Sequence, residues 1–310
     1  MSVQAHRDAR GVRTGFGLAP GLVAFVILAG TQAAAGPVAL LTSGSFPPYA
    51  ATAAAFCASY HDTVTSFACD DHDSATVKRA IQRATPDVIV AVGIKAAQFA
   101  RDHFPRTPLV YCVVHGPERY DLIGSWVTGV SADVPAAAQL GALRKAAPAV
   151  RHVLFVRDAS DEAALRAARA AASQAGIELV DLAVRDASEV AAGARELAPR
   201  ADAVWLTADR SVATPEVFRY LLQLSIEQKK PMLVFSESLV RAGALVAVAP
   251  DYEWIGARVA ELVARIESGE RAGDLAVVPL KRTRVVVNPA TAHLLGLAAP
   301  ETVVTGVEER

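Results

Sequence analysis

The sequence is poor in cysteine, in aromatic residues and in excess charge of either sign. It has 310 residues, of which three are cysteine and 6% are aromatic, and its 31 basic residues nearly balance 32 acidic ones. Three cysteines are too few to build a disulfide scaffold. A net charge of −1 provides no concentrated basic face for phosphate contacts, so nucleic acid is not an expected partner. With 52% hydrophobic residues, the chain can instead bury a full core.

The motifs of common catalytic and nucleotide-binding sites are also missing. The sequence contains no Gly-x-Ser-x-Gly elbow, no Walker loop and no His-Glu-x-x-His. The best metal-ligand candidates are the carboxylates and imidazoles of residues 61–73. That segment is also typical of a polar loop that opens a helix, with Asp73 or Ser74 as the N-cap, and we favour this interpretation. We therefore expect neither a metal ion nor a cofactor.

A short apolar run lies near the N-terminus. Three arginines precede the apolar residues 16–30, and Ala33-Ala34-Ala35 follow them. This pattern predicts a cleaved secretory signal in residues 1–35, because it combines a basic segment, a short apolar segment and small residues at the cleavage site. It therefore predicts a periplasmic protein. A retained membrane anchor is the alternative, but the run is shorter than the roughly 20 residues that a spanning helix needs. In an oxidising compartment Cys57 and Cys69 could pair, or they could be small buried hydrophobes.

From residue 37 onward, apolar runs alternate with amphipathic stretches. The first series of apolar runs comprises residues 37–41, 63–68, 87–92, 109–114 and 126–130. Near-continuous apolar strands separated by helical periods predict a parallel sheet that is covered on both faces. The pattern then restarts, with apolar runs at residues 152–156, 177–184, 203–206 and 231–235. The sequence therefore predicts two doubly wound α/β lobes, one after the other.

The residues that follow these runs are candidates for a binding site, because ligands bind beyond the carboxyl ends of parallel strands. Small hydroxyls and glycines in the first series suit an anionic group, whereas Asp209 and Glu237 in the second suit an ammonium. Together they predict a zwitterion such as an amino acid. Each residue also fits an ordinary role, for example Ser45 as an N-cap, but their shared position at strand ends favours a site. The candidate ligand-binding residues are Ser43, Gly44, Ser45, Phe46, Gly93, His115, Asp158, Asp209 and Glu237.

Several segments spread over the whole mature chain point to one family by their order and spacing. These segments are residues 126–131, 203–209, 231–237, 239–245, 251–256 and 287–297. Together they resemble the ABC-transporter substrate-binding proteins, a family that includes tryptophan- and tyrosine-binding members. By position, the resemblance assigns Ser43, Ser45, Gly93, Asp209 and Glu237 to the ligand pocket.

The resemblance also implies a type I periplasmic-binding fold, in which two lobes are joined by a hinge of three crossing segments. The crossings are expected near Ser131, near Pro250-Asp251 and within residues 273–279. The first lobe is then formed by residues 36–130 plus 252–272, and the second by residues 131–251 plus 273–310.

The function that the resemblance implies is that of the extracytoplasmic solute-binding component of an ABC importer. Such a protein is not an enzyme; it traps a small polar or amino-acid-like ligand and passes it to an ABC permease in the inner membrane, and we expect it to be a monomer. One segment departs from the family pattern, because Val114-His115-Gly116-Pro117 stands where relatives have an Asp-Pro pair and a glycine-rich stretch. Two alternatives stay open: a ligand-sensing module that feeds a signalling partner, and a secreted α/β hydrolase, which would need a nucleophile, a base and an orienting group.

Overall fold

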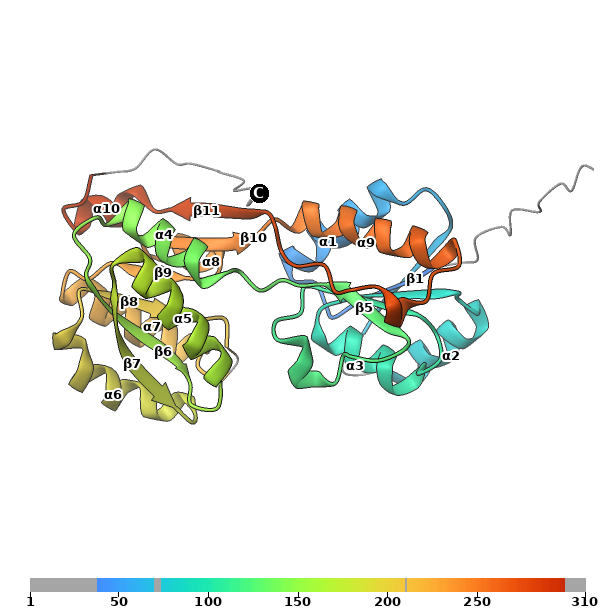
Figure 1. Cartoon of the computed structure of the whole chain (residues 1–310), viewed down its shortest axis with the longest axis horizontal. Coiled ribbons are helices and arrows are strands. Elements are labelled where there is room, and N and C mark those ends of the chain that lie inside the picture. The colour runs from blue at the N-terminus through green and yellow to red at the C-terminus, as the bar shows by residue number, and fades with distance from the viewer. Residues whose placement is uncertain (1–37, 70–73, 210, 299–310) are drawn as a thin grey trace, which may run out of the picture. The chain divides into compact units, whose positions relative to one another are not determined.

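The computed structural model describes residues 38–69, 74–209 and 211–298 of the chain. The predicted signal, residues 1–35, and the acidic residues 70–73 lie outside this range. The described residues form two α/β lobes, each built on its own sheet (Figure 1). No helix in this part of the chain combines the length and the apolar character that crossing a membrane requires. No disulfide joins Cys57 to Cys69.

The sheet of the first lobe has five parallel strands in the order β2-β1-β3-β4-β5. The strands are β1 (Val38–Thr42), β2 (Val64–Ala68), β3 (Val88–Val92), β4 (Leu109–Cys112) and β5 (Val127–Val130). The central strand β3 is apolar and buried along its whole length, as expected for a strand covered by helices on both faces. One face is covered by α1 (Pro47–Ser59) and α9 (Tyr252–Glu267), and the other by α2 (Ser74–Ala84) and α3 (Ile94–His103).

The sheet of the second lobe has six strands in the order β11-β10-β9-β8-β6-β7. The strands are β6 (His152–Asp158), β7 (Glu178–Val184), β8 (Ala203–Leu206), β9 (Met232–Val234), β10 (Val246–Pro250) and β11 (Thr283–Val287). One face packs against α4 (Ala136–Ala146), α5 (Glu162–Ala175) and α10 (Pro289–Leu294). The other packs against α6 (Val190–Leu197), α7 (Pro215–Glu227) and α8 (Glu237–Arg241). The last strand, β11, runs antiparallel to β10, so this sheet is mixed and not wholly parallel.

Three backbone segments connect the lobes. The first runs from β5 to α4 through residues 131–135, the second from β10 to α9 at Asp251, and the third leads into β11. Hydrogen bonds join them, because the Ser131 N–H donates to the Val278 carbonyl (2.9 Å) and the Asp251 N–H donates to the Arg282 carbonyl (3.0 Å). The predicted fold class, two α/β lobes joined by three segments, is confirmed.

The third crossing lies later in the chain than the sequence indicates. Leu275 and Leu280 are buried in the same core as α1 and α9. The Leu275 carbonyl also accepts a hydrogen bond from the Thr128 hydroxyl of β5 (3.0 Å). Residues 273–280, which the sequence analysis assigns to the second lobe, therefore pack with the first. Burial of these two leucines is what holds the segment there.

Helix α9 returns to the first lobe from far along the chain, and its contact with α1 depends on Gly256. A Cβ at this position would lie 2.6 Å from the Thr52 carbonyl oxygen and 2.7 Å from the Ala55 Cβ. We predict that Gly256→Ala forces the two helices apart and lowers the free energy of unfolding by about 1–3 kcal/mol, the usual cost of overpacking. Urea unfolding followed by circular dichroism measures the difference.

Gly141→Ala in α4 is the matched control, because a Cβ there meets no atom within 4 Å. This variant is expected to gain about 0.5–1 kcal/mol from the better helix propensity of alanine. Equal stabilities of the two variants would show that α1 and α9 are not in close contact.

Candidate ligand-binding site

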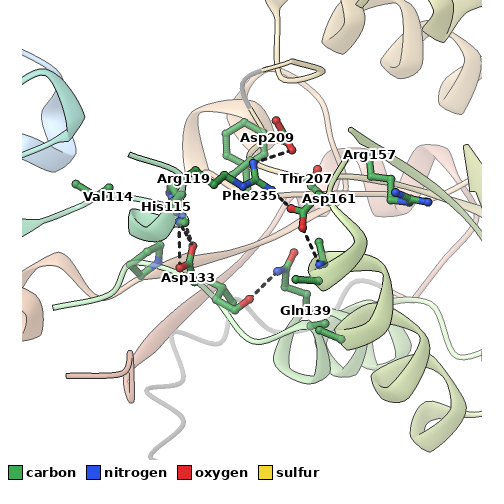
Figure 2. A pocket seen from close by; sticks show the side chains of 18 of the residues that line it. Val114, His115, Arg119, Asp133, Gln139, Arg157, Asp161, Thr207, Asp209 and Phe235 are labelled. Carbon is green, nitrogen blue, oxygen red and sulfur yellow. Dashed lines mark hydrogen bonds and ion pairs between the residues drawn. The ribbon is translucent and has the colours of Figure 1, made fainter. Parts of the chain in front are cut away.

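A cavity of about 700 Å³ is lined by residues of both lobes, at the carboxyl ends of their strands (Figure 2). From the first lobe, Ser43 follows β1, Ile94 begins α3 after β3, and His115 follows β4. From the second lobe, Asp209 follows β8 and Phe235 follows β9. This is where open parallel sheets bind their ligands.

Ser43 lines the first-lobe end of the cavity at the N-terminus of α3, and Gly93 packs against it. The Ser43 Oγ accepts a hydrogen bond from the Ala96 N–H (2.9 Å). Gly93 has φ +89°, and a Cβ on it would lie 2.7 Å from the Ser43 Oγ and 2.8 Å from the Tyr49 ring. Only glycine fits here, because it tolerates this backbone conformation and leaves room for both side chains.

Asp133, on the first crossing, is tied to the loop that follows β4. Its carboxylate is 3.1 Å from the His115 Nδ1 and accepts hydrogen bonds from the Gly116 N–H (3.3 Å) and the Ser131 hydroxyl (3.1 Å). Burial by itself raises the pKa of the Asp133 carboxyl, but pairing with His115 and these hydrogen bonds outweigh it and hold the pKa below its ordinary value. Asp133 is therefore an ionised group that joins the hinge to the cavity.

Two carboxylates mark the second-lobe end of the cavity. Asp161 is the N-cap of α5, where its Oδ1 accepts the Ala164 N–H (2.8 Å). The Asp209 Oδ1 accepts the N–H and the hydroxyl of Ser211 (both 3.1 Å). Arg119, from the short 3₁₀ helix η1 (Pro117–Tyr120) of the first lobe, donates to the Oδ2 of both acids (Figure 2). The side chains of Asp161 and Asp209 are 17% and 11% exposed.

Aromatic and aliphatic side chains form the wall between these two ends. The rings of Phe155 and Trp205 pack with their centroids 4.6 Å apart. The Trp205 Nε1 donates to the Gln139 Oε1 (2.9 Å), and the Gln139 Nε2 donates to the Val134 carbonyl (2.9 Å), which fixes both side chains. The cavity is thus mostly apolar with polar groups at its ends, a composition typical of small-molecule sites.

Of the residues that the sequence proposes for the site, the structure brings Ser43, His115 and Asp209 to the cavity wall, with Gly93 supporting Ser43. The other candidates do not line the cavity within the described residues: Gly44, Ser45, Phe46, Asp158 and Glu237.

Local hydrogen bonds and ion pairs account for these positions. Residues 44–46 lead into α1, where Phe46 is half exposed and contacts Tyr49 edge to face. The Asp158 carboxylate accepts the hydroxyl and the N–H of Ser160 (both 2.6 Å), which lower its pKa. Glu237, the first residue of α8, pairs with Arg241 one turn later (2.7 Å).

Four residues of the cavity are not among those that the sequence predicts for the site: Arg119, Asp133, Asp161 and Gln139. Asp161 has a sequence signal, because it precedes an apolar helical pattern in the position of an N-cap just after a strand end. Arg119 has none, since its partners are 42 and 90 residues away. Among the described residues, no three His, Cys, Asp or Glu side chains are grouped so that they could hold a metal ion. The acidic candidates at residues 70–73 lie outside that part of the chain.

Comparisons with known proteins place the fold. A family model described as ABC transporter substrate binding protein matches residues 62–309. A tyrosine-binding protein from Clostridioides difficile (strain R20291) is 22% identical over 220 residues, which are 68% of this chain and 63% of the relative. The chain thus spans less than two thirds of that relative's length.

Solved structures of substrate-binding proteins share the two-lobed fold. The ligand-free, open structure of a substrate-binding protein with adhesive properties from Clostridium difficile has a TM-score of 0.73 and 20% identity, covering 88% of this chain and 98% of its own. An ABC domain from Streptococcus pneumoniae in complex with L-Trp has a TM-score of 0.66 and 21% identity, covering 86% and 97%. A periplasmic solute-binding protein from Actinobacillus succinogenes 130z has a TM-score of 0.53 and 11% identity, covering 83% and 99%. At these identities the likeness shows the fold.

The lowered pKa of Asp133 predicts a pH-dependent contribution to stability. A carboxyl whose pKa is depressed by folding stabilises the protein above the unfolded value, about 3.9, and this contribution is lost as the pH falls through the folded value. We expect Asp133→Asn to be less stable than the wild type at pH 7 by about 0.2–1 kcal/mol, because the side chain is half exposed. The difference should shrink below pH 4. Thermal melts of both proteins between pH 7 and pH 3 test this, and a difference that is constant with pH would contradict it.

Proposed function

The chain belongs to the family of ABC transporter substrate-binding proteins, and we propose that it binds a free amino acid in the cavity lined by both lobes. The family consists of substrate-binding proteins and not of enzymes, so the hydrolase alternative has no support. The observation that carries the proposal is the opposite chemistry of the two cavity ends. The Ser43 hydroxyl and the start of α3 lie at the first-lobe end, and the carboxylates of Asp161 and Asp209 lie at the second-lobe end.

The first-lobe end suits the ligand carboxylate. The first N–H groups of an α-helix have no partner within the helix, and they carry the positive end of its dipole. Ile94 and Lys95, the first residues of α3, line the cavity next to the Ser43 hydroxyl. A carboxylate placed here would meet backbone N–H groups, a hydroxyl and a lysine on the same helix turn.

The second-lobe end suits the ligand ammonium. Asp209 is only 11% exposed, its Oδ1 is held by Ser211, and its Oδ2 accepts a hydrogen bond from Arg119, so a ligand cation would take the place of that arginine. A nearly buried carboxylate needs a positively charged partner, because an unpaired charge is costly to remove from water. The ammonium of an amino acid supplies that charge.

The apolar wall suits the ligand's side chain. Tyr49, Phe155, Trp205 and Phe235 all line the cavity. The name of the C. difficile relative and the L-Trp in the S. pneumoniae structure support an aromatic side chain on the ligand. Aromatic rings bury a large apolar area and pack well against one another.

The same proposal covers the partner and the place of action. The export signal predicted in residues 1–35 and the family membership support a periplasmic monomer that delivers its ligand to an ABC permease of the inner membrane. A ligand sensor would share the same cavity and differ only in its partner.

A thermal-shift screen of the mature protein against the free amino acids tests the proposal, and an aromatic amino acid is the expected hit. Asp209→Asn should weaken the binding of that amino acid by roughly 10- to 100-fold, since it removes a hydrogen bond to a charged group worth about 1.5–3 kcal/mol.

Glu237→Gln is the matched control, because Glu237 is the second acid that the sequence proposes but it pairs with Arg241 away from the cavity wall. Its affinity for the amino acid should equal that of the wild type. Equal weakening by both substitutions would remove Asp209 from the site, and a screen without any amino-acid hit would refute the proposed ligand class.

A further inference from the structure

Arg119 holds an unusual position for a surface arginine, because it bridges two carboxylates of the other lobe inside the cavity. One terminal nitrogen, Nη1, donates to the Asp209 Oδ2 (3.3 Å), and the other, Nη2, donates to the Asp161 Oδ2 (Figure 2). Two carboxylates therefore converge on the two ends of a single planar cation. This is the geometry that a bound guanidinium group would itself require.

The two acids are held in place without Arg119. In each of them Oδ1 accepts hydrogen bonds from residues close by in the chain. The Asp161 Oδ1 accepts the Ala164 N–H of α5, and the Asp209 Oδ1 accepts the N–H and the hydroxyl of Ser211. In each of them Oδ2 is the atom that binds Arg119. Removing the arginine would therefore leave a preformed pair of carboxylate oxygens that point into the cavity.

Among the described residues, the one other arginine of the cavity wall is already paired. Arg157 also lines the cavity, but it is 4% exposed and its Nε and Nη2 donate to the two carboxylate oxygens of Asp181 (2.9 and 3.0 Å). Its remaining terminal nitrogen donates to the carbonyls of Asp158 and Ala159. Arg119 is therefore the arginine that pairs with Asp161 and Asp209 in the described part of this wall.

Arg119 is also placed so that its side chain can move away from Asp161 and Asp209. Its side chain is 40% exposed, and ion pairs that reach water contribute little net stability. It lies on η1, a single short turn whose flanking residues, Gly116 and Asp121, both have left-handed backbone conformations. The arginine is thus carried by a loop, whereas its partners sit at the start of a long helix and at a strand end.

We propose that Asp161 and Asp209 form a receptor for the cationic group of the ligand, an ammonium or a guanidinium, and that Arg119 occupies this receptor in the ligand-free protein until the ligand displaces it. The inference rests on the proposed function and adds to it the part of Asp161 and the role of Arg119. Arg119 acts as a tethered competitor: a cationic ligand replaces it without leaving a buried carboxylate unpaired, whereas a neutral ligand such as a sugar cannot.

The test uses methylguanidinium chloride, a free analogue of the arginine head group, with the full mature protein. Arg119→Gln should gain a saturable thermal stabilisation by methylguanidinium in the millimolar range, because the empty receptor then accepts the free cation. The wild type should require at least a tenfold higher concentration, since its own arginine fills the site. Sodium chloride at equal ionic strength controls for screening.

Two further variants separate a built receptor from unspecific effects. Arg119→Gln combined with Asp161→Asn should lose the response to methylguanidinium. Arg119→Lys should show an intermediate response, because one ammonium cannot offer two parallel donors to the two acids; it also keeps the test valid if the glutamine variant does not fold. Equal responses of wild type and Arg119→Gln, or no response in any Arg119 variant, would overturn the proposal.

The outcome is separable from that of the proposed function. If the amino-acid screen finds no ligand but Arg119→Gln binds methylguanidinium as described, the receptor stands and the ligand class must be sought among other cations. If an amino acid binds the wild type and Arg119→Gln leaves that affinity unchanged, the tethered-competitor role is wrong while the amino-acid function stands. The expected result is tighter binding of the amino acid by Arg119→Gln.

Discussion

Parallel strand pairing determines where the cavity lies. In the first sheet it brings the carboxyl ends of β1, β3 and β4 to one edge, and in the second it does the same for β6, β8 and β9. Several polar groups of the cavity lie just after one of these strand ends: Ser43, His115, Asp161 and Asp209. Position 93 does not tolerate a side chain. The Ser43 hydroxyl accepts a hydrogen bond from the first turn of α3, and a Cβ on Gly93 would collide with that hydroxyl. The sheet order thus sets the place of the site, and close backbone packing sets its shape.

The hinge and the cavity share residues. Asp133 lies on the first crossing, and it is bonded to His115 and Gly116 on the loop after β4 that also carries Arg119. The carbonyl of Val134, the next residue of the crossing, accepts a hydrogen bond from the Gln139 Nε2. The Gln139 Oε1 in turn accepts one from the Trp205 Nε1 in the apolar wall. A change in the cavity therefore acts directly on the segment that joins the lobes. Hinged substrate-binding proteins close around a ligand by changing the backbone angles of a few such residues.

The sequence predicts the fold well because its signals are local. Continuous apolar strands such as Val88–Val92 and helical periods identify both lobes without any knowledge of contacts. The strand-end rule also finds Ser43, His115 and Asp209, since it needs only the position of each strand. The strand-end rule does not predict the direction in which the loop after each strand turns. Glu237 and Asp209 look equivalent in sequence, yet Glu237 starts a helix and pairs with Arg241, four residues away. The contacts of Arg119 are set by tertiary structure and leave no local signal in the sequence. Whether residues 273–280 pack with the first or the second lobe depends on the burial of two leucines.

The chemistry of the cavity favours a ligand with separated charges over a neutral one for a reason beyond simple attraction. Asp161 and Asp209 are each bonded to neighbouring backbone N–H groups, so the second lobe holds two carboxylates in a partly dry site. Such groups need a cation as partner, and in the structure that cation is Arg119 of the first lobe. A ligand that enters without a positive charge would have to leave Arg119 in place and accept a smaller cavity. In the proposed mode of binding, a ligand with an ammonium replaces the arginine and keeps the charges balanced, while its carboxylate lies at the start of α3. The proposed receptor would thus select by charge, and the aromatic wall would select by shape.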